Sequence, residues 1–222
     1  MLSLVIPTLN AASGLPTTLA ALGERPGGSE IVICDGGSGD GTVSIAHEYG
    51  ARVVAAPRGR GPQMIAGAQA ARGDWLLFLH ADTRLAAGWS RAAADFCAAP
   101  AAAERAAYFR FALDDRSVAA RRLEALVALR CRLFALPYGD QGLLISAALY
   151  RALGGYRPLM LMEDVDLVRR LGRRRLHGLA HPAVTSAARY RDGYVRRSAR
   201  NLACLSLYFA GVAPARIARL YG

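Results

Sequence analysis

The stretch Ile31-Val-Ile-Cys-Asp35-Gly-Gly-Ser-Gly-Asp40-Gly41 decides the fold of this chain. Its first four residues form a continuous apolar run, which is typical of a strand buried on both faces of a sheet. The glycines that follow favour a tight turn, and residues 42–49 continue with a helical pattern. Asp35 therefore falls at the carboxyl end of a strand, the edge at which open parallel sheets bind their ligands.

The rest of the first 80 residues repeats this order of strand, turn and helix. Apolar runs predict further strands at Leu2–Ile6, Val53–Ala56 and Trp75–Leu79, and helical patterns separate them at Ser13–Leu22 and Pro62–Ala71. Such an alternation predicts an α/β fold with a mostly parallel, Rossmann-like sheet flanked by helices.

The pattern is less regular after residue 88. We expect an alanine-rich helix over Gly88–Ala103, a strand over Ala106–Leu113 and a long helix over Val118–Leu136. Shorter elements follow, with a strand at Gly142–Ser146, helices at Ala147–Leu153 and Glu163–Leu171, and a helical tail at Gly193–Ala210 and Ala215–Leu220.

The positive charge is concentrated in the second half of the 222 residues and is carried by arginine alone. Residues 1–100 hold seven Arg and eight acids, a net charge of −1, whereas residues 101–222 hold twenty-one Arg and nine acids, a net charge of +12. Because no nucleic-acid-binding module is recognisable, we expect no nucleic-acid partner. The many alanines and the lack of lysine are typical of a GC-rich genome.

Cysteine usage and the N-terminus favour a cytoplasmic protein. The four cysteines are far apart and form no CxxC pair, which is typical of reduced, buried thiols. The N-terminus lacks the basic segment of a signal peptide. The longest apolar stretch, residues 202–214, is too short to span a bilayer.

The glycine cluster alone is compatible with two enzyme classes. Read as DxGxGxG, residues 35–41 match the glycine-rich loop of S-adenosylmethionine-dependent methyltransferases. That fold requires an acidic residue at the end of the next strand, but here the next strand is followed by Pro57-Arg58. The methyltransferase loop also normally follows the first strand of the sheet, whereas the loop in this chain follows the second. A nucleotide-binding module without catalytic activity is the other alternative.

Two acidic motifs follow at later strand and helix ends. Asp82 comes directly after the buried strand that ends at Leu79, where a carboxylate can hold Mg²⁺ or Mn²⁺ against a nucleotide diphosphate. Met162-Glu163-Asp164-Val-Asp166 opens a helix, and one of its carboxylates can act as general base on a hydroxyl group.

Taken together, these motifs resemble the family 2 glycosyltransferases with a GT-A fold. The resemblance rests on Val5-Ile-Pro-Thr-Leu-Asn10, Cys34–Thr42, Phe78-Leu-His-Ala-Asp82 and Glu163-Asp164, which agree in order and spacing. It implies a GT-A domain over residues 1–190, with a donor half at about 1–87 and an acceptor half at about 88–190. Residues 191–222 would be a helical C-terminal extension.

The resemblance also implies roles for single residues. Asp35 would bind the base of a UDP- or GDP-linked sugar, and the rest of the donor site would comprise Pro7, Thr8, Asn10, Gly37, Arg58, Arg60, His80, Ala81 and Asp82. Asp164 would be the catalytic base of an inverting transfer, with Glu163 beside it as a supporting group. Asp140 and Gln141 fall in the acceptor region of the family.

The chain departs from the family pattern at two positions that bear on the metal and the base. His80 replaces the first aspartate of the DxD motif, so Mg²⁺ or Mn²⁺ would be held by Asp82, with His181 as a second candidate ligand. Gly36 stands where the family often has a second aspartate.

Four stretches are similar to one bacterial subgroup of the family, which is associated with arsenosugar biosynthesis and with radical S-adenosylmethionine proteins. They are Gly59–Met64, Gly139–Gln141, Leu161–Asp164 and Ala210–Tyr221. The acceptor would be a small molecule or a lipid-linked one. The apolar and basic segment 201–221 can pack on the catalytic domain, form a homodimer or contact the inner face of a membrane peripherally, and we expect packing.

Overall fold

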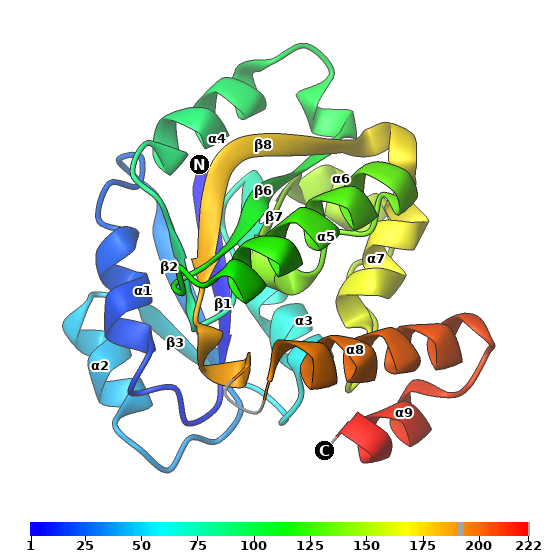
Figure 1. Cartoon of the computed structure of the whole chain (residues 1–222). Coiled ribbons are helices and arrows are strands. Elements are labelled where there is room, and N and C mark those ends of the chain that lie inside the picture. The colour runs from blue at the N-terminus through cyan, green and yellow to red at the C-terminus, as the bar shows by residue number, and fades with distance from the viewer. Residues whose placement is uncertain (191–192, 222) are drawn as a thin grey trace.

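The computed structural model describes residues 1–190 and 193–221. Within these ranges, eight strands form one sheet in the order β3-β2-β1-β4-β7-β6-β8-β5 (Figure 1). The strands are β1 (Leu2–Thr8), β2 (Glu30–Asp35), β3 (Arg52–Ala55), β4 (Trp75–Phe78), β5 (Thr83–Leu85), β6 (Ala106–Leu113), β7 (Leu143–Ser146) and β8 (Leu176–Thr185). The α/β fold expected from the sequence is confirmed.

Helices pack on both faces of this sheet (Figure 1). They are α1 (Leu15–Ala21), α2 (Thr42–Glu48), α3 (Arg60–Ala70), α4 (Trp89–Ala98), α5 (Val118–Phe134), α6 (Ala147–Ala152), α7 (Glu163–Leu171), α8 (Tyr194–Phe209) and α9 (Pro214–Tyr221). Among these described helices, none combines the length and the apolar character needed to cross a membrane.

The alternation of β1 shows how the sequence forms two cores. Leu4 and Ile6 lie in the core under α1, α2 and α4, whereas Val5 faces the core under α3, α6 and α7. All three side chains are fully buried, because the strand is covered on both faces. This burial fixes the register of β1 and with it the position of the loop that follows Thr8.

The expected parallel arrangement is confirmed for β3-β2-β1-β4 and for the pair β6–β8, whereas the other pairs of the sheet are antiparallel. β7 pairs antiparallel with both β4 and β6, and β5 pairs antiparallel with β8. The sheet is therefore mixed. The second half lacks the regular alternation of strand and helix that parallel crossovers require.

Two elements differ from the sequence prediction for reasons of backbone chemistry. The helix expected to run to Ala103 ends at Ala98, because Pro100 disfavours the helical conformation at Ala99, which is extended (φ −69°, ψ 148°). The long strand β8 was not expected, since Gly178 and Pro182 both argue against a strand interior. It pairs with β6 through a register shift at Phe109 and Arg110.

The C-terminal helices pack against the acceptor-side helix α7, as expected. Cys204 and Leu205 of α8 and Ile217 of α9 share a buried cluster with Met162 and Val165. In Figure 1, α8 and α9 lie next to the N-terminal end of α7. The domain boundary expected between residues 190 and 191 lies at the edge of the described residues and stays a prediction.

Candidate active site

A cleft of about 700 Å³ opens at the carboxyl ends of β1 and β4. We call it the large cleft. Eight of the sequence-predicted donor-site residues line it, namely Pro7, Thr8, Asn10, Arg58, Arg60, His80, Ala81 and Asp82. Its other lining residues are Leu9, Ala11, Ser13, Gly14, Gly59, Gln63, Met160, Leu161, Ser186 and Ala188. The parallel part of the sheet thus brings three separate sequence motifs together at its ligand-binding edge.

Asp35 and Gly37, which were also expected in this site, do not line the large cleft. The Asp35 carboxylate instead holds its own turn together. Thr8 Oγ1 (2.9 Å) and Ser38 Oγ (2.5 Å) donate to Oδ1, and the N–H groups of Gly37 (3.0 Å) and Ser38 (2.7 Å) donate to Oδ2. Although burial alone would raise the pKa of Asp35, these hydrogen bonds lower it, so the carboxylate is ionised at neutral pH.

The glycine-rich turn is also tied to the loop that follows β1. Asn10, which adopts a left-handed conformation (φ 51°), accepts a hydrogen bond from the Gly39 N–H (2.9 Å) through its side chain. Its own N–H donates to Ser38 Oγ (2.8 Å). The Ala11 N–H donates to Thr42 Oγ1 (2.8 Å). Local polar residues therefore shape one wall of the large cleft without help from distant segments.

Gln63, at the start of α3, lines the large cleft but was not among the predicted site residues. Its side-chain amide is buried and donates to the carbonyl oxygens of Thr8 (2.6 Å) and Cys34 (2.7 Å), so it bridges the ends of β1 and β2. Helix α3 can approach this closely because residue 67 is glycine: a Cβ there would lie 2.3 Å from Cys34 Sγ. In the sequence, Gln63 lies within the stretch Gly59–Met64, which is similar to the bacterial subgroup of the family.

The start of α3 is in equally close contact with the loop before α7. A Cβ at Gly61 would lie 2.5 Å from the carbonyl oxygens of both Arg157 and Leu159. The Gly61 N–H also donates to the Leu159 carbonyl (3.3 Å). Any side chain at position 61 would therefore push the two segments apart.

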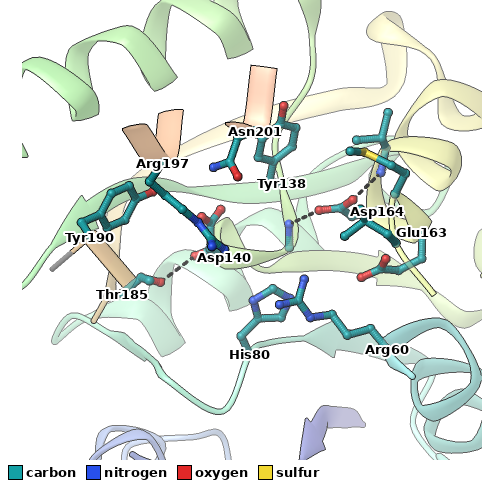
Figure 2. Close-up of a pocket in the computed structure, with 14 residues that line it drawn as sticks. Arg60, His80, Tyr138, Asp140, Glu163, Asp164, Thr185, Tyr190, Arg197 and Asn201 are labelled. Carbon is teal, nitrogen blue, oxygen red and sulfur yellow. Dashed lines mark hydrogen bonds between the residues drawn. The ribbon is translucent and has the colours of Figure 1, made fainter. Parts of the chain in front are cut away.

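A second cavity of about 80 Å³, the small pocket, shares lining residues with the large cleft. Figure 2 shows the residues that line the small pocket. Arg60, His80 and Leu161 line both cavities. The remaining lining residues of the small pocket are Tyr138, Gly139, Asp140, Met162, Glu163, Asp164, Val165, Thr185, Tyr190, Arg197 and Asn201. The predicted catalytic pair and the predicted Asp140 thus face the same space.

The three acids at the start of α7 have different surroundings. Asp164 accepts hydrogen bonds from the N–H groups of Gly139 (2.7 Å) and Val165 (2.7 Å), as Figure 2 shows. Asp166 is buried in an ion pair with Arg170 (2.7 Å) and lines neither cavity. The two backbone donors hold the Asp164 side chain at the wall of the pocket.

Glu163 is almost fully buried at 2% exposure, and its Oε2 accepts no hydrogen bond from any described residue. Burial, and then the charge of Asp164, raise the pKa of Glu163 to about 8, against a smaller opposing effect of Arg60. At neutral pH the Glu163 carboxyl group therefore carries a proton. In Figure 2 the Glu163 carboxyl group points toward Arg60.

His80 separates the two cavities and lies directly against Gly139. A Cβ at Gly139 would lie 2.5 Å from His80 Nε2 and 2.9 Å from Cε1. The imidazole at the end of β4 and the Gly139–Gln141 turn are therefore complementary in shape, although they are far apart in the sequence. Figure 2 shows His80 and Arg60 together on one side of the small pocket.

Gln141, expected on the acceptor side, has its side chain behind the pocket wall. It is buried, its Nε2 donates to the Phe109 carbonyl (3.1 Å), and its Oε1 accepts from Arg130 Nη2 (3.2 Å). It lines neither cavity and supports the turn that carries Asp140. Four other residues of the small pocket belong to no motif and were not predicted from the sequence, namely Tyr138, Thr185, Tyr190 and Asn201.

Asp82 is the acidic residue among the described residues that line the large cleft. No cluster of three or more His, Cys, Asp or Glu ligands occurs in the described part of the chain. One carboxylate is nevertheless a suitable protein ligand for Mg²⁺, which is commonly bound by one or two carboxylates together with substrate phosphates. The second candidate ligand, His181, lies on β8 next to Gly88 and lines neither cavity.

Comparison with known proteins gives both a family and a fold. A family model described as glycosyl transferase family 2 matches residues 3–128. A PGL/p-HBAD biosynthesis glycosyltransferase of Mycobacterium bovis is 40% identical over 93 residues, covering 38% of this chain and 36% of that protein. The chain thus spans little more than a third of that curated relative.

Two solved structures have the same fold. S. aureus TarS 1–349, also solved with UDP, matches with a TM-score of 0.66 at 18% identity, over 84% of this chain and 60% of that one. A glucosyl-3-phosphoglycerate synthase of Mycobacterium tuberculosis, in complex with Mn²⁺, UDP and glucosyl-3-phosphoglycerate, matches with a TM-score of 0.58 at 19% identity. That match covers 82% of this chain and 70% of the synthase chain.

Proposed function

The chain belongs to glycosyltransferase family 2, and on that premise we propose that it is an inverting glycosyltransferase. It would move a sugar from a nucleotide-diphosphate donor to an acceptor hydroxyl group. The observation that carries this proposal is the junction of the two cavities at Arg60, His80 and Leu161. A donor in the large cleft would present its sugar to a small pocket that contains a carboxylate.

The residues of the large cleft suit a nucleotide diphosphate. Arg58 and Arg60 enter it from the segment after β3, and guanidinium groups bind phosphate oxygens well. Asp82 would hold a divalent cation, Mg²⁺ or Mn²⁺, which when bound would neutralise charge on the departing diphosphate. The complex of a structurally similar synthase with Mn²⁺ and UDP supports this part of the proposal.

Asp164 is the proposed catalytic base. Two backbone donors keep its carboxylate oriented at the wall of the small pocket, where it would take the proton of the attacking hydroxyl. Glu163, protonated at neutral pH, is a hydrogen-bond donor beside it and would position the acceptor. With one ionised carboxylate and direct attack, the configuration at the anomeric carbon would be inverted.

The finer assignments belong to the same proposal. The subgroup resemblance suggests a role in arsenosugar or other glycoconjugate biosynthesis and rests on its four sequence stretches alone. The lipid-linked acceptor, the homodimer and the cytoplasmic location stay predictions. Peripheral membrane contact gains some support because α8 exposes Val195, Leu202 and Phe209; flotation with anionic vesicles would test it, with Leu202→Asp as the disrupting variant.

A binding screen tests the function and its alternatives together. UDP and GDP with Mn²⁺ are expected to raise the melting temperature of the protein, and S-adenosylmethionine is expected to leave it unchanged. Incubation with UDP- and GDP-sugars should then release the nucleotide. NMR of the product should show the inverted anomer. Stabilisation by S-adenosylmethionine alone, or nucleotide binding with no turnover in the presence of any hydroxyl acceptor, would contradict the proposal.

A further inference from the structure

We infer that Gln63, rather than Asp35, recognises the nucleobase of the donor, and that it selects bases with a ring N–H donor such as uracil or guanine. This inference rests on the proposed function, since it concerns the nucleotide bound in the large cleft. It follows from the hydrogen bonds at the ends of β1 and β2, from the finding that Gln63 lines the large cleft and Asp35 does not, and from the space around Gly36.

Asp35 has no free acceptor site for a base. A carboxylate offers about four in-plane lone-pair positions, two on each oxygen. In Asp35 all four are taken by donors from its own turn and from Thr8. The side chain is also absent from the lining of the large cleft. Asp35 therefore shapes the turn, and a base would have to displace one of its donors to reach it.

In Gln63, unlike Asp35, the side-chain donor positions are used and the acceptor oxygen is not. Its amide nitrogen lies between two carbonyl oxygens, those of Thr8 and Cys34, which can only accept hydrogen bonds. The group facing them must therefore be the NH₂, and both of its hydrogens are used. This fixes the direction of Oε1, which accepts no hydrogen bond from a described residue, while the side chain lines the large cleft. The strand ends thus hold a neutral acceptor oriented toward the cleft.

Gly36 provides the room for this amide. A Cβ at position 36 would lie 3.1 Å from Gln63 Nε2 and 3.2 Å from its Cδ. The position where the resembled family often has a second aspartate is therefore occupied, in this chain, by the Gln63 side chain. Gly36 and Gln63 therefore act together. The glycine leaves space on the turn, and the Gln63 amide fills the space that the second aspartate of the family would take.

The chemistry of the bases determines the selectivity. Uracil presents N3–H and guanine presents N1–H, and both can donate to Oε1. Cytosine N3 and adenine N1 are acceptors at the corresponding position, so they would face Oε1 without a proton between them. A buried or half-buried acceptor that loses its donor in this way is costly. UDP and GDP are thus favoured over CDP and ADP.

Calorimetry with UDP, CDP and 3-methyl-UDP, each with Mn²⁺, tests the inference on the full chain. The 3-methyl group removes the N3–H and leaves the phosphates unchanged. The wild-type protein should bind UDP about 10- to 100-fold more tightly than either analogue, the range that one hydrogen-bonded base contact provides. Gln63→Met should bind all three with nearly equal affinity. A merely structural role of Gln63 would weaken all three nucleotides alike and leave the preference unchanged, which would overturn the inference.

Gly36→Ala is a milder second variant, because it displaces the Gln63 amide without deleting it, and it should reduce the preference for UDP. Gly39→Ala is its matched control in the same turn, since a Cβ there meets nothing within 4 Å. The control should retain the wild-type preference. Loss of the preference in Asp35→Asn but not in Gln63→Met would assign recognition to Asp35 and overturn the inference. Failure of the wild type to bind any of the nucleotides would instead refute the proposed function.

Discussion

The large cleft takes most of its wall from the first 82 residues, whereas the small pocket draws on segments between Arg60 and Asn201. The wall of the large cleft is held by hydrogen bonds between neighbouring loops, such as those of Asn10 and Asp35. The wall of the small pocket is held by contacts between distant segments, such as that of His80 with Gly139. The proposed nucleotide site is therefore formed by contacts between neighbouring loops, and the proposed acceptor site by tertiary packing.

From this difference we expect many substitutions in one half of the site to leave the other half unchanged. A cleft held by neighbouring loops does not depend on how the later helices pack. Here the α8 residues Arg197 and Asn201 reach the small pocket from the C-terminal region. Substitutions that affect only one side of the site would show whether this separation holds.

Asp164→Asn should have the largest effect and should affect only the acceptor side. Without a base, turnover of the donor sugar should fall by about 10²- to 10⁴-fold, while the Kd for UDP with Mn²⁺ should stay within about twofold of wild type. Turnover measured by nucleotide release and binding measured by calorimetry would test this prediction. Glu48→Gln, on the exposed surface of α2, is the control and should keep the wild-type turnover. Full activity of Asp164→Asn would remove the proposed base.

Glu163→Gln should change the pH dependence of stability. The pKa of Glu163 is raised from 4.5 to about 8, so between these values the native protein keeps a proton that the unfolded chain loses. Wild-type stability should therefore fall as the pH rises through this window. The variant lacks this dependence. Between pH 5 and pH 8, its free energy of unfolding should therefore rise relative to that of wild type by a few kcal/mol, on the order of one per pKa unit.

Urea unfolding of both proteins at pH 5, 6.5 and 8 would measure the change. Glu48→Gln, on the exposed surface of α2, serves as control and should give curves parallel to wild type. Parallel curves for Glu163→Gln would show that the carboxyl group does not keep its proton in the native state.

Gly139→Ala should disturb the wall between the two cavities. Its backbone conformation suits alanine, but the added methyl group would overlap the His80 ring and force it to move. Overpacking of this kind costs about 1–3 kcal/mol of stability, and turnover should fall together with donor affinity, because His80 lines both cavities. Gly27→Ala, in open space, should be close to wild type by unfolding and by activity. If turnover alone falls, His80 contributes only to the acceptor side.

Asp82→Ala should have the smallest effect and should affect only the large cleft. We expect UDP binding in Mn²⁺ to weaken by about tenfold, because one of the charge-assisted ligands of the cation is lost. Binding in EDTA should be the same for the variant and the wild type. Calorimetry under both conditions would test this, and an equal loss of affinity in both would argue against a cation at Asp82.

The donor side could largely be predicted from the sequence, because its motifs are short, local and placed at strand ends. Eight of the expected donor residues line one cleft. Asp35 shows the limit of such inference: its position was predicted, but its hydrogen bonds turn the carboxylate inward. The pairing of Gln63 with Gly36 depends on how closely α3 approaches β2, which no local pattern reveals.

On the side of the small pocket, the sequence predicted Asp140 and the two acids that open α7. Glu163 and Asp164 were recognisable, but the strand β8 that brings Thr185 to the pocket was hidden by Gly178 and Pro182. Asn201 reaches the pocket on α8, which packs on α7, and Tyr190 reaches it from the short helical turn after β8. Neither residue belongs to a recognisable motif. Buried contacts between distant segments, rather than motifs, determine this part of the site.

The contact of Gly61 with residues 157–159 has a practical consequence for building chimeric enzymes. A cut after the donor half, at about residue 87, looks natural from the two-part organisation of the site. It would nevertheless separate Gly61 from the carbonyl groups of Arg157 and Leu159, which leave no room for a Cβ. A hybrid that takes residues 1–87 from one relative must therefore take the 157–162 loop from the same parent, even though that loop leads into the proposed catalytic acids of the other half.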